Sequence, residues 1–168
     1  MQLFYKKGQG ATEYLVLLAV VLIVAMVAIA LLGFFPGLAG DAKIAQSDSY
    51  WRGTSRPFAI LEHSMASTGS NITIVVQNVD ADQREITQIS MAGSGLSGMA
   101  NSTSASSDLY SSSKRFFSSG EKKTLHVDLG SSCTSGNSYE LYVNFTYNTG
   151  SINALKQYGE KTLVGRCN

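Results

Sequence analysis

Hydrophobic and polar positions divide this chain into two parts with different patterns. From Tyr14 to Phe35 the sequence is apolar for 22 positions without a formal charge. As an α-helix this run is about 33 Å long, enough to span the hydrocarbon core of a bilayer. It is apolar on every side, so it is typical of a helix surrounded by lipid or by other helices, and not of one on a water-facing surface. The pattern therefore predicts a single membrane-spanning helix near the N-terminus.

A cleaved secretory signal peptide is the alternative for the same run. Lys6 and Lys7 precede it, and Gly37-Leu38-Ala39 resembles a small-residue cleavage site. The hydrophobic region of such a peptide is only about 7 to 15 residues long, however. The length of the run favours a helix that stays in the protein.

The apolar run ends in a sequence that disfavours regular helix. Pro36 lacks a backbone donor and two glycines loosen the backbone, so we expect a kink or a break over Gly33–Gly37. Good helix formers follow, and helix is predicted to resume and continue to about Tyr50. The residues expected to face the following domain are Leu38, Ala42, Ala45 and Trp51.

From Pro57 onward the hydrophobic period changes to two, which is the period of half-buried strands. Five to seven strands separated by turns predict an antiparallel β-sandwich or small sheet domain. The fold class is therefore α+β, with a long N-terminal apolar helix followed by an antiparallel β-sandwich-like head domain. The clearest strands are residues 71–77, 125–129 and 141–147, and further candidates are 58–62, 84–90 and 161–164.

The segment 92–119 is dominated by Ser and Gly and is expected to form a long exposed loop, interrupted by Phe116 and Phe117. Its first part, 93–98, satisfies the GxGxxG pattern of dinucleotide-binding proteins. No helix pattern follows these glycines, so the helix N-terminus that would hold a pyrophosphate is missing. We therefore expect no cofactor here.

Charge and composition narrow the possible partners. The formal net charge of the 168 residues is +1, and the chain has no dense run of Lys or Arg. A nucleic-acid-binding protein needs a basic face to neutralise phosphates. Nucleic acid is therefore excluded as a partner.

The two cysteines, Cys133 and Cys167, both lie in the predicted outer domain. A disulfide between them suits an oxidising exterior and would stabilise the fold by roughly 3 to 4 kcal/mol in the chain-entropy model. Free thiols are the alternative. His63 and His126 are not at ligand spacing with the cysteines, so no metal site is predicted.

Three Asn-x-Ser/Thr triplets are candidate acceptors for N-glycosylation, at Asn71, Asn101 and Asn144. Asn101 is the strongest candidate because it lies in the predicted loop. For catalysis, the sequence contains neither a GxSxG elbow nor an HExxH pair. We therefore expect no catalytic residues and no enzymatic activity.

A carboxylate, Glu13, stands at the edge of the apolar helix, where a charge tends to have a partner or a function. The helix macrodipole alone would favour a negative charge in the first turn. The surrounding residues suggest more, because Gly8, Gln9, Glu13 and Leu17 resemble the class III signal peptide of archaeal type IV pilins. Ala11 stands where that family commonly has Ser.

This resemblance implies that a prepilin peptidase cuts between Gly8 and Gln9 and leaves the apolar helix in the mature protein. The new α-amino group at Gln9 would lie one helical turn from Glu13, close enough for opposite charges to attract. Glu13 and Leu17 are thus the predicted assembly residues. The predicted parts are a leader over residues 1–8, a helix over 9–52 that is first membrane anchor and then filament core, and an extracellular head over 53–168.

The resemblance further implies a structural subunit of a type IV pilus-like surface filament that serves in adhesion. Its partners would be identical subunits, the prepilin peptidase and the pilus assembly machinery, with the membrane as its location before assembly. A second structural possibility is an archaellin-like subunit. The main alternative from another functional class is a monomeric, membrane-anchored surface binding protein, and an enzyme carried on the anchored β-domain is a third option.

Overall fold

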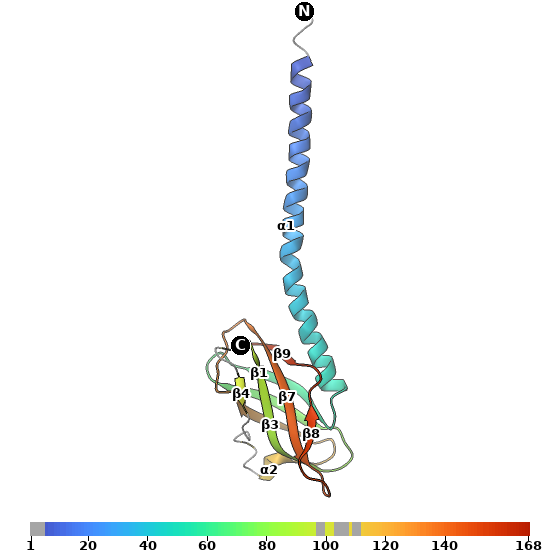
Figure 1. Cartoon of the computed structure of the whole chain (residues 1–168), viewed down its shortest axis with the longest axis vertical. Coiled ribbons are helices and arrows are strands. Elements are labelled where there is room, and N and C mark those ends of the chain that lie inside the picture. Colours follow the sequence, from blue (N-terminus) through green and yellow to red (C-terminus); the bar gives the residue numbers. More distant parts are fainter. Residues whose placement is uncertain (1–5, 97–99, 103–107, 109–111) are drawn as a thin grey trace, which may run out of the picture. The chain divides into compact units, whose positions relative to one another are not determined.

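The computed structural model describes residues 6–96, 100–102, 108 and 112–168. The chain consists of two compact units, Met1–Asp41 and Ala42–Asn168. A long helix, α1, precedes a β-domain that also contains one short helix (Figure 1). The elements are α1 (Lys6–Gly53), β1 (Phe58–Met65), β2 (Asn71–Asn78), β3 (Arg84–Ser94), β4 (Ala100–Ser102), α2 (Ser112–Arg115), β5 (Phe116–Phe117), β6 (Lys122–Asp128), β7 (Ser138–Asn148), β8 (Leu155–Tyr158) and β9 (Leu163–Arg166).

Helix α1 contains the predicted membrane-spanning segment. Residues Gly10–Gly33 are long and apolar enough to cross a membrane, and none of their side chains is buried within the subunit. The helix continues through Pro36 without interruption, so a break at Gly33–Gly37 is not found. The physical reason is that a proline removes only one hydrogen-bond donor from the helix, so the hydrogen bonds of the turns before and after it can persist.

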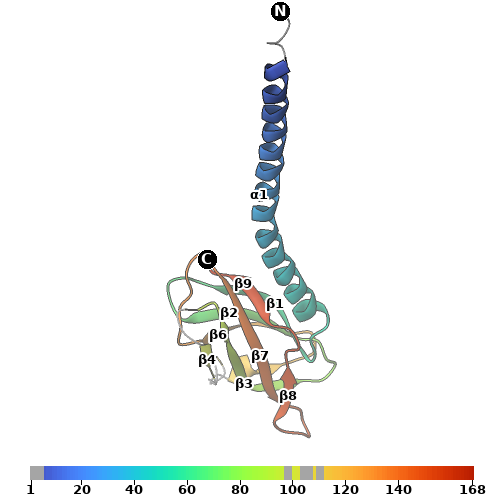
Figure 2. The ribbon, with the colours of Figure 1, turned by 45° about the horizontal axis from the view of Figure 1, so that its top comes forward.

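The strands of the second unit form two antiparallel sheets, which Figures 1 and 2 show as separate layers. One sheet has the order β1-β2-β6, and the other has the order β4-β3-β7-β8, with β5 paired to β3 and β9 paired to β7. A single buried cluster combines side chains of both sheets, such as Ile74 of β2 with Ile89 of β3 and Val143 of β7. This is a sandwich, and the predicted α+β fold class is confirmed.

Alternating burial explains why the strongest strands were predicted correctly. In β2 the side chains of Ile72, Ile74 and Val76 are completely buried, while the residues between them are partly exposed. Strand β8 lacks this signal because its buried residue is polar. The amide of Gln157 donates to Ser55 Oγ and to the Phe58 carbonyl, and its Oε1 accepts from the Phe58 N–H.

The expectation of a long exposed loop over residues 92–119 is wrong in part. Strand β3 continues to Ser94 and pairs with β4, while β5 pairs with the beginning of β3. Phe117 is completely buried, because an aromatic side chain gains enough by burial to bring a Ser-rich segment onto the sheet. Residues 97–99, 103–107 and 109–111 lie outside the described residues.

The glycines of the GxGxxG pattern have a structural role in this sheet. A Cβ atom on Gly93 would collide with the carbonyl oxygen of Glu140, and one on Gly95 would collide with the carbonyl oxygen of Ser138. Gly95 also has a positive φ of 88°. These glycines therefore permit the close approach of β3 to β7.

The predicted packing face of the last helical turns needs correction. Trp51 is buried as expected, but Ala42 and Ala45 are exposed, and the buried position between them and Trp51 is Ser47. Ser47 is buried because its Oγ accepts the backbone N–H of Val164 at 2.9 Å. A hydrophobic pattern cannot identify a face that includes a hydrogen-bonded serine. The side chain of Leu38 lies outside the described part.

Candidate functional site

The predicted processing and assembly residues all lie on α1. Gly8, Gln9, Glu13 and Leu17 fall within the helix, and Gln9, Glu13 and Leu17 follow one another at intervals of four. Residues four apart lie on the same side of a helix, one turn above the other. Glu13 is exposed and Leu17 is 65% exposed, so both are available to groups outside the subunit.

A continuous apolar surface extends along the helix beyond these residues. Its large side chains are exposed to between 43% at Leu18 and 71% at Met26. Soluble monomers rarely expose apolar surface on this scale, which marks a membrane or protein interface. Apolar contacts with this surface are not directional. Replacing water on it by lipid tails or by other apolar helices is favourable by about 25 cal/mol per Å² of apolar surface buried.

The last turns of α1 belong to the second unit, where they are packed against the sandwich. Trp51 is 1% exposed and forms an edge-to-face contact with Tyr50 at 5.2 Å between ring centroids. The hydroxyl of Tyr50 accepts the backbone N–H of Glu160 at 3.1 Å. A Cβ atom on Gly159 would lie 2.6 Å from the indole of Trp51, so only glycine fits under that ring. No sequence signal singles out Gly159, because its role depends on where the indole lies.

A small polar cluster lies beside this contact. His63 Nδ1 and the Tyr139 hydroxyl are 2.7 Å apart, and His63 Nε2 lies 3.5 Å from a carboxylate oxygen of Asp48. Burial lowers the pKa of His63, as does the charge of Arg52, and together they outweigh the hydrogen bond and the negative charge of Asp48. Burial raises the pKa of Tyr139, and the Asp48 carboxylate adds to that effect. The imidazole is therefore neutral near pH 7.

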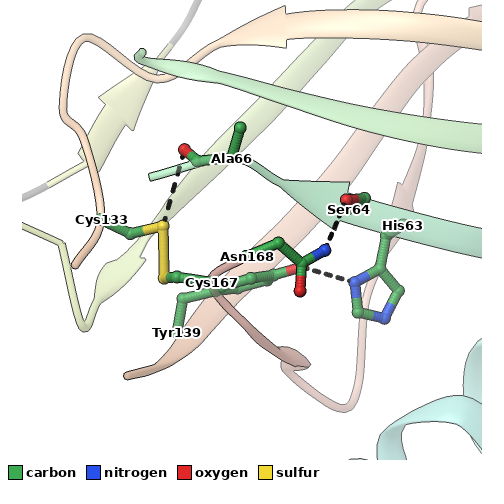
Figure 3. Close-up of a disulfide and its surroundings, with 7 residues drawn as sticks. All are labelled: His63, Ser64, Ala66, Cys133, Tyr139, Cys167 and Asn168. Carbon is green, nitrogen blue, oxygen red and sulfur yellow. Dashed lines mark hydrogen bonds between the residues drawn. A yellow bond between two sulfur atoms is a disulfide. The ribbon is translucent and has the colours of Figure 1, made fainter. Parts of the chain in front are cut away.

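A disulfide joins Cys133 and Cys167, with a Cα–Cα distance of 6.0 Å (Figure 3). The C-terminal residues are also held by the backbone, because the Asn168 N–H donates to the Met65 carbonyl and its own carbonyl accepts from Ser67. The Asn168 side chain donates to Ser64 Oγ at 3.1 Å, and Figure 3 marks this hydrogen bond with a dashed line. The disulfide therefore fastens the C-terminus to the segment between β6 and β7, and the backbone hydrogen bonds fasten it to the end of β1.

The three candidate glycosylation sites differ in their surroundings. Asn71 is exposed at the beginning of β2. Asn144 lies in β7 between β3 and β8, and its Oδ1 accepts the Gly159 N–H at 3.3 Å. Asn101 pairs with Ala92 of β3 through its backbone, and its side chain is outside the described part. Of the two described side chains, Asn71 is the more accessible, and occupancy of all three stays a prediction.

Neither histidine is part of a metal-binding arrangement in the described residues, where no group of three or more His, Cys, Asp or Glu side chains comes together. His126 lies 3.0 Å from a carboxylate oxygen of Asp108. Hydrogen bonds from His126 and the ammonium group of Lys114 lower the pKa of Asp108, against a desolvation effect that by itself would raise it. This is an ion-pairing arrangement at the surface, and its geometry suggests no reaction.

Comparison with protein families identifies the N-terminal segment. Residues 6–32 match the family described as Class III signal peptide, the signal of type IV pilins and archaellins. The match confirms the resemblance to a class III signal peptide, whereas the roles of Gly8, Gln9, Glu13 and Leu17 stay predictions. Comparison with curated proteins found no match. The signal indicates a pilin-like or archaellin-like surface subunit that is processed by a prepilin peptidase.

Proposed function

We propose that this chain is a structural subunit of an archaeal type IV pilus-like surface filament, which polymerises through its N-terminal helix and serves in adhesion. One observation carries the proposal: the class III signal at residues 6–32 coincides with a helical segment whose apolar side chains are exposed from Tyr14 to Leu32. Such a helix requires an apolar environment that the subunit itself does not supply. A membrane supplies it before assembly, and other copies of the helix supply it afterwards.

In this proposal, cleavage between Gly8 and Gln9 removes residues 1–8 and creates an α-amino group beside Glu13. A carboxylate at the edge of an apolar bundle is costly unless a positive charge accompanies it. The α-amino group of the same or a neighbouring subunit provides that charge. Pairing is thus possible only in the processed chain, which links cleavage to assembly.

Residues 9–52 then form the filament core, and residues 53–168 form the head on its surface. Removing the apolar side chains of α1 from water stabilises the polymer by about 25 cal/mol per Å² buried. Exposed residues at Leu17, Val21 and Val24, which are 65%, 66% and 63% accessible, offer a stripe for such contacts. Glycans at Asn71 or Asn101 would suit the exposed side of a surface filament.

Mass and N-terminal analysis of the chain from sheared surface filaments, compared with the chain retained in membranes, tests this proposal. We expect an N-terminus at Gln9 in polymeric material, and a mass that is lower by two hydrogen atoms because of the disulfide. A chain found only as membrane-bound monomer starting at Met1 would contradict the filament role. The anchored monomeric binding protein would then be the better interpretation.

Two matched pairs of variants separate the steps. Gly8→Leu is expected to block cleavage and filament formation, whereas Gly10→Ala is expected to be cut, because a Cβ atom at Gly10 meets nothing within 4 Å in the subunit.

Glu13→Gln is expected to be cut but to yield several-fold less filament, whereas Glu62→Gln, a change to an exposed carboxylate of the head, leaves the yield unchanged. Normal filament yield from Glu13→Gln would show that the charge pair does not drive assembly.

A further inference from the structure

A hollow of about 180 Å³ lies at one edge of the six-stranded sheet, beside the turn that joins β7 to β8. It is remote in sequence from the assembly residues of α1, and nothing in the proposed filament role uses it. The residues that line it include Arg84, Glu85, Phe116, Asn148, Thr149 and Gly150. Pockets for larger ligands measure roughly 300 to 1,000 Å³, so this one has room for a single small ring.

Strand register brings three different side chains into one row across the floor of this hollow. Glu85 of β3 is paired with Phe116 of β5 on one side and with Asn148 of β7 on the other. Directly paired residues of antiparallel strands point to the same face of the sheet. An aromatic ring, a carboxylate and an amide therefore stand side by side, although 63 residues separate Glu85 from Asn148.

Hydrogen bonds and an ion pair hold these groups in place. Asn148 Nδ2 donates to Glu85 Oε2 at 3.0 Å, and Arg115 forms an ion pair with Glu85, with 3.1 Å between Nε and Oε1. The Arg115 guanidinium also lies 5.2 Å from the centroid of the Phe116 ring. Asn148 Oδ1 accepts the Ala154 N–H at 2.9 Å, which fixes the turn that forms one wall. Such preorganisation lowers the entropy cost of binding a ligand.

The charges of the hollow are neutralised within the protein. Arg84 is paired with Asp80 at 3.0 Å and lies 3.7 Å from Asp82, while Arg115 is paired with Glu85. Among the described residues that line the hollow, both charged side chains, Arg84 and Glu85, therefore have an ion-pair partner. The lining groups that remain available are neutral or balanced, namely a ring, an amide and the Glu85 carboxylate, which is 20% exposed and paired with Arg115.

We propose that this hollow binds one ring of a neutral carbohydrate. The apolar C–H face of a sugar ring packs on the Phe116 side chain, and its hydroxyl groups donate to Glu85 and accept from Asn148. This combination of an aromatic surface with planar, fixed hydrogen-bonding groups suits a hydroxylated ring that carries no charge. The inference deepens the proposed adhesive function, because a filament displays many copies of a weak site and thereby multiplies its avidity.

Saturation-transfer NMR on the full-length chain, held in micelles of a detergent without a sugar headgroup, tests this directly. The probes are the methyl glycosides of mannose, galactose, glucose and N-acetylglucosamine, with methyl glucuronide as the charged counterpart of the glucoside. At least one neutral glycoside is expected to receive saturation. The glucuronide is expected to bind more weakly than the glucoside, because its carboxylate meets no unpaired cation.

The matched variants are Phe116→Ala and Tyr158→Ala. Phe116→Ala is expected to weaken binding about tenfold through loss of the ring contact, whereas Tyr158, which is 63% exposed and lies on β8 outside the residues that line the hollow, is expected to be dispensable. Glu85→Gln keeps the shape of the side chain and is expected to weaken binding several-fold. Fluorescence of the buried Trp51 shows whether each variant is folded.

The proposal is overturned if no glycoside receives saturation, if the folded Phe116→Ala protein binds as well as the wild type, or if the glucuronide binds best. Its failure is distinguishable from that of the filament role, because the helix and the hollow are tested separately. Filaments that begin at Gln9 but bind no glycoside would contradict only the carbohydrate site. Glycoside binding by a chain that never polymerises would contradict only the filament.

Discussion

The apolar residues of this protein are exposed in one of its two units and buried in the other. Between residues 10 and 33 every side chain of α1 is exposed, including leucines and valines that are more than half accessible. In the sandwich, Phe58, Ile74 and Phe145 are completely buried. Hydrophobic residues of the head therefore stabilise its own fold, whereas those of the helix are removed from water only by contact with lipid or with other chains. The two units should consequently respond to mutation in different assays.

The largest expected contrast comes from truncating one apolar side chain in each unit. Phe58 is buried against Phe117, Phe145 and Tyr147, with ring centroids 5.5 to 5.6 Å apart. We expect Phe58→Ala to reduce the free energy of unfolding of the head by about 3 to 5 kcal/mol. Leu22, which is 54% exposed, can be changed to alanine without altering that value. The measurement is denaturant unfolding in micelles, monitored by Trp51 fluorescence.

Equal reductions in the free energy of unfolding from the two changes would contradict this difference between the units, because they would place Leu22 in the same cooperative unit as the core. In a filament, Leu22→Ala is expected to matter as well. It should lower the temperature at which the polymers dissociate, an effect that the isolated subunit does not show.

The disulfide should have the next largest effect, and only on the head. Cys133 and Cys167 close a loop with a sequence separation of 34. Replacing both by serine is expected to cost about 3 to 4 kcal/mol in the chain-entropy model. The wild-type chain treated with reductant is the matched control and should unfold at the same denaturant concentration as the double variant. A stability equal to that of the oxidised protein would show that the C-terminal hydrogen bonds suffice.

A third contrast uses two glycines. A Cβ atom on Gly159 would lie 2.6 Å from the Trp51 indole and 2.7 Å from the Val143 carbonyl oxygen, whereas one on Gly10 meets nothing. Gly159→Ala is expected to destabilise the head by about 1 to 3 kcal/mol through overpacking and to change the Trp51 emission. Gly10→Ala should leave both unchanged. An unaltered emission spectrum for Gly159→Ala would contradict the packing described for the end of α1.

The smallest effect expected is a pH dependence that is confined to the head. The pKa of His63 is lowered by burial, so below the pKa of an unfolded histidine, about 6.5, the unfolded chain binds the proton more readily than the folded one. Stability is therefore complete above that pH and falls as the pH drops toward the lowered pKa. His63→Gln should flatten the pH profile between pH 7 and 5. His126→Gln is the control, since its side chain is 49% exposed.

Much of the fold could be predicted because its signals lie in consecutive residues. The apolar run from Tyr14 gave the helix, and alternation around Ile74 and Val143 gave the strands. The errors arose where a polar residue is buried or an apolar one is exposed. Gln157 is buried at 6% accessibility in a strand without hydrophobic alternation, and Ala45 is exposed on a helix where it was expected to pack.

The candidate assembly residues stay a prediction, and that prediction needs only the spacing of Gln9, Glu13 and Leu17 within one helix. The hollow beside Phe116 could not be predicted. Its three central side chains come from β3, β5 and β7, and nothing in any one strand indicates that they meet. The role of the GxGxxG segment could not be predicted either, because Gly93 and Gly95 are required by the close approach of the neighbouring strand β7.

The sequence by itself determined which segment is apolar enough to cross a membrane and which end carries the class III signal, because transfer free energy and signal motifs are properties of short contiguous segments. It also determined that the head is built of strands. The tertiary structure decided which serine, glutamine and glycine are indispensable, how the C-terminus is fastened, and where a ring, a carboxylate and an amide stand together. Those features depend on strand register and close packing between residues far apart in the chain, and such contacts exist only after the sandwich has formed.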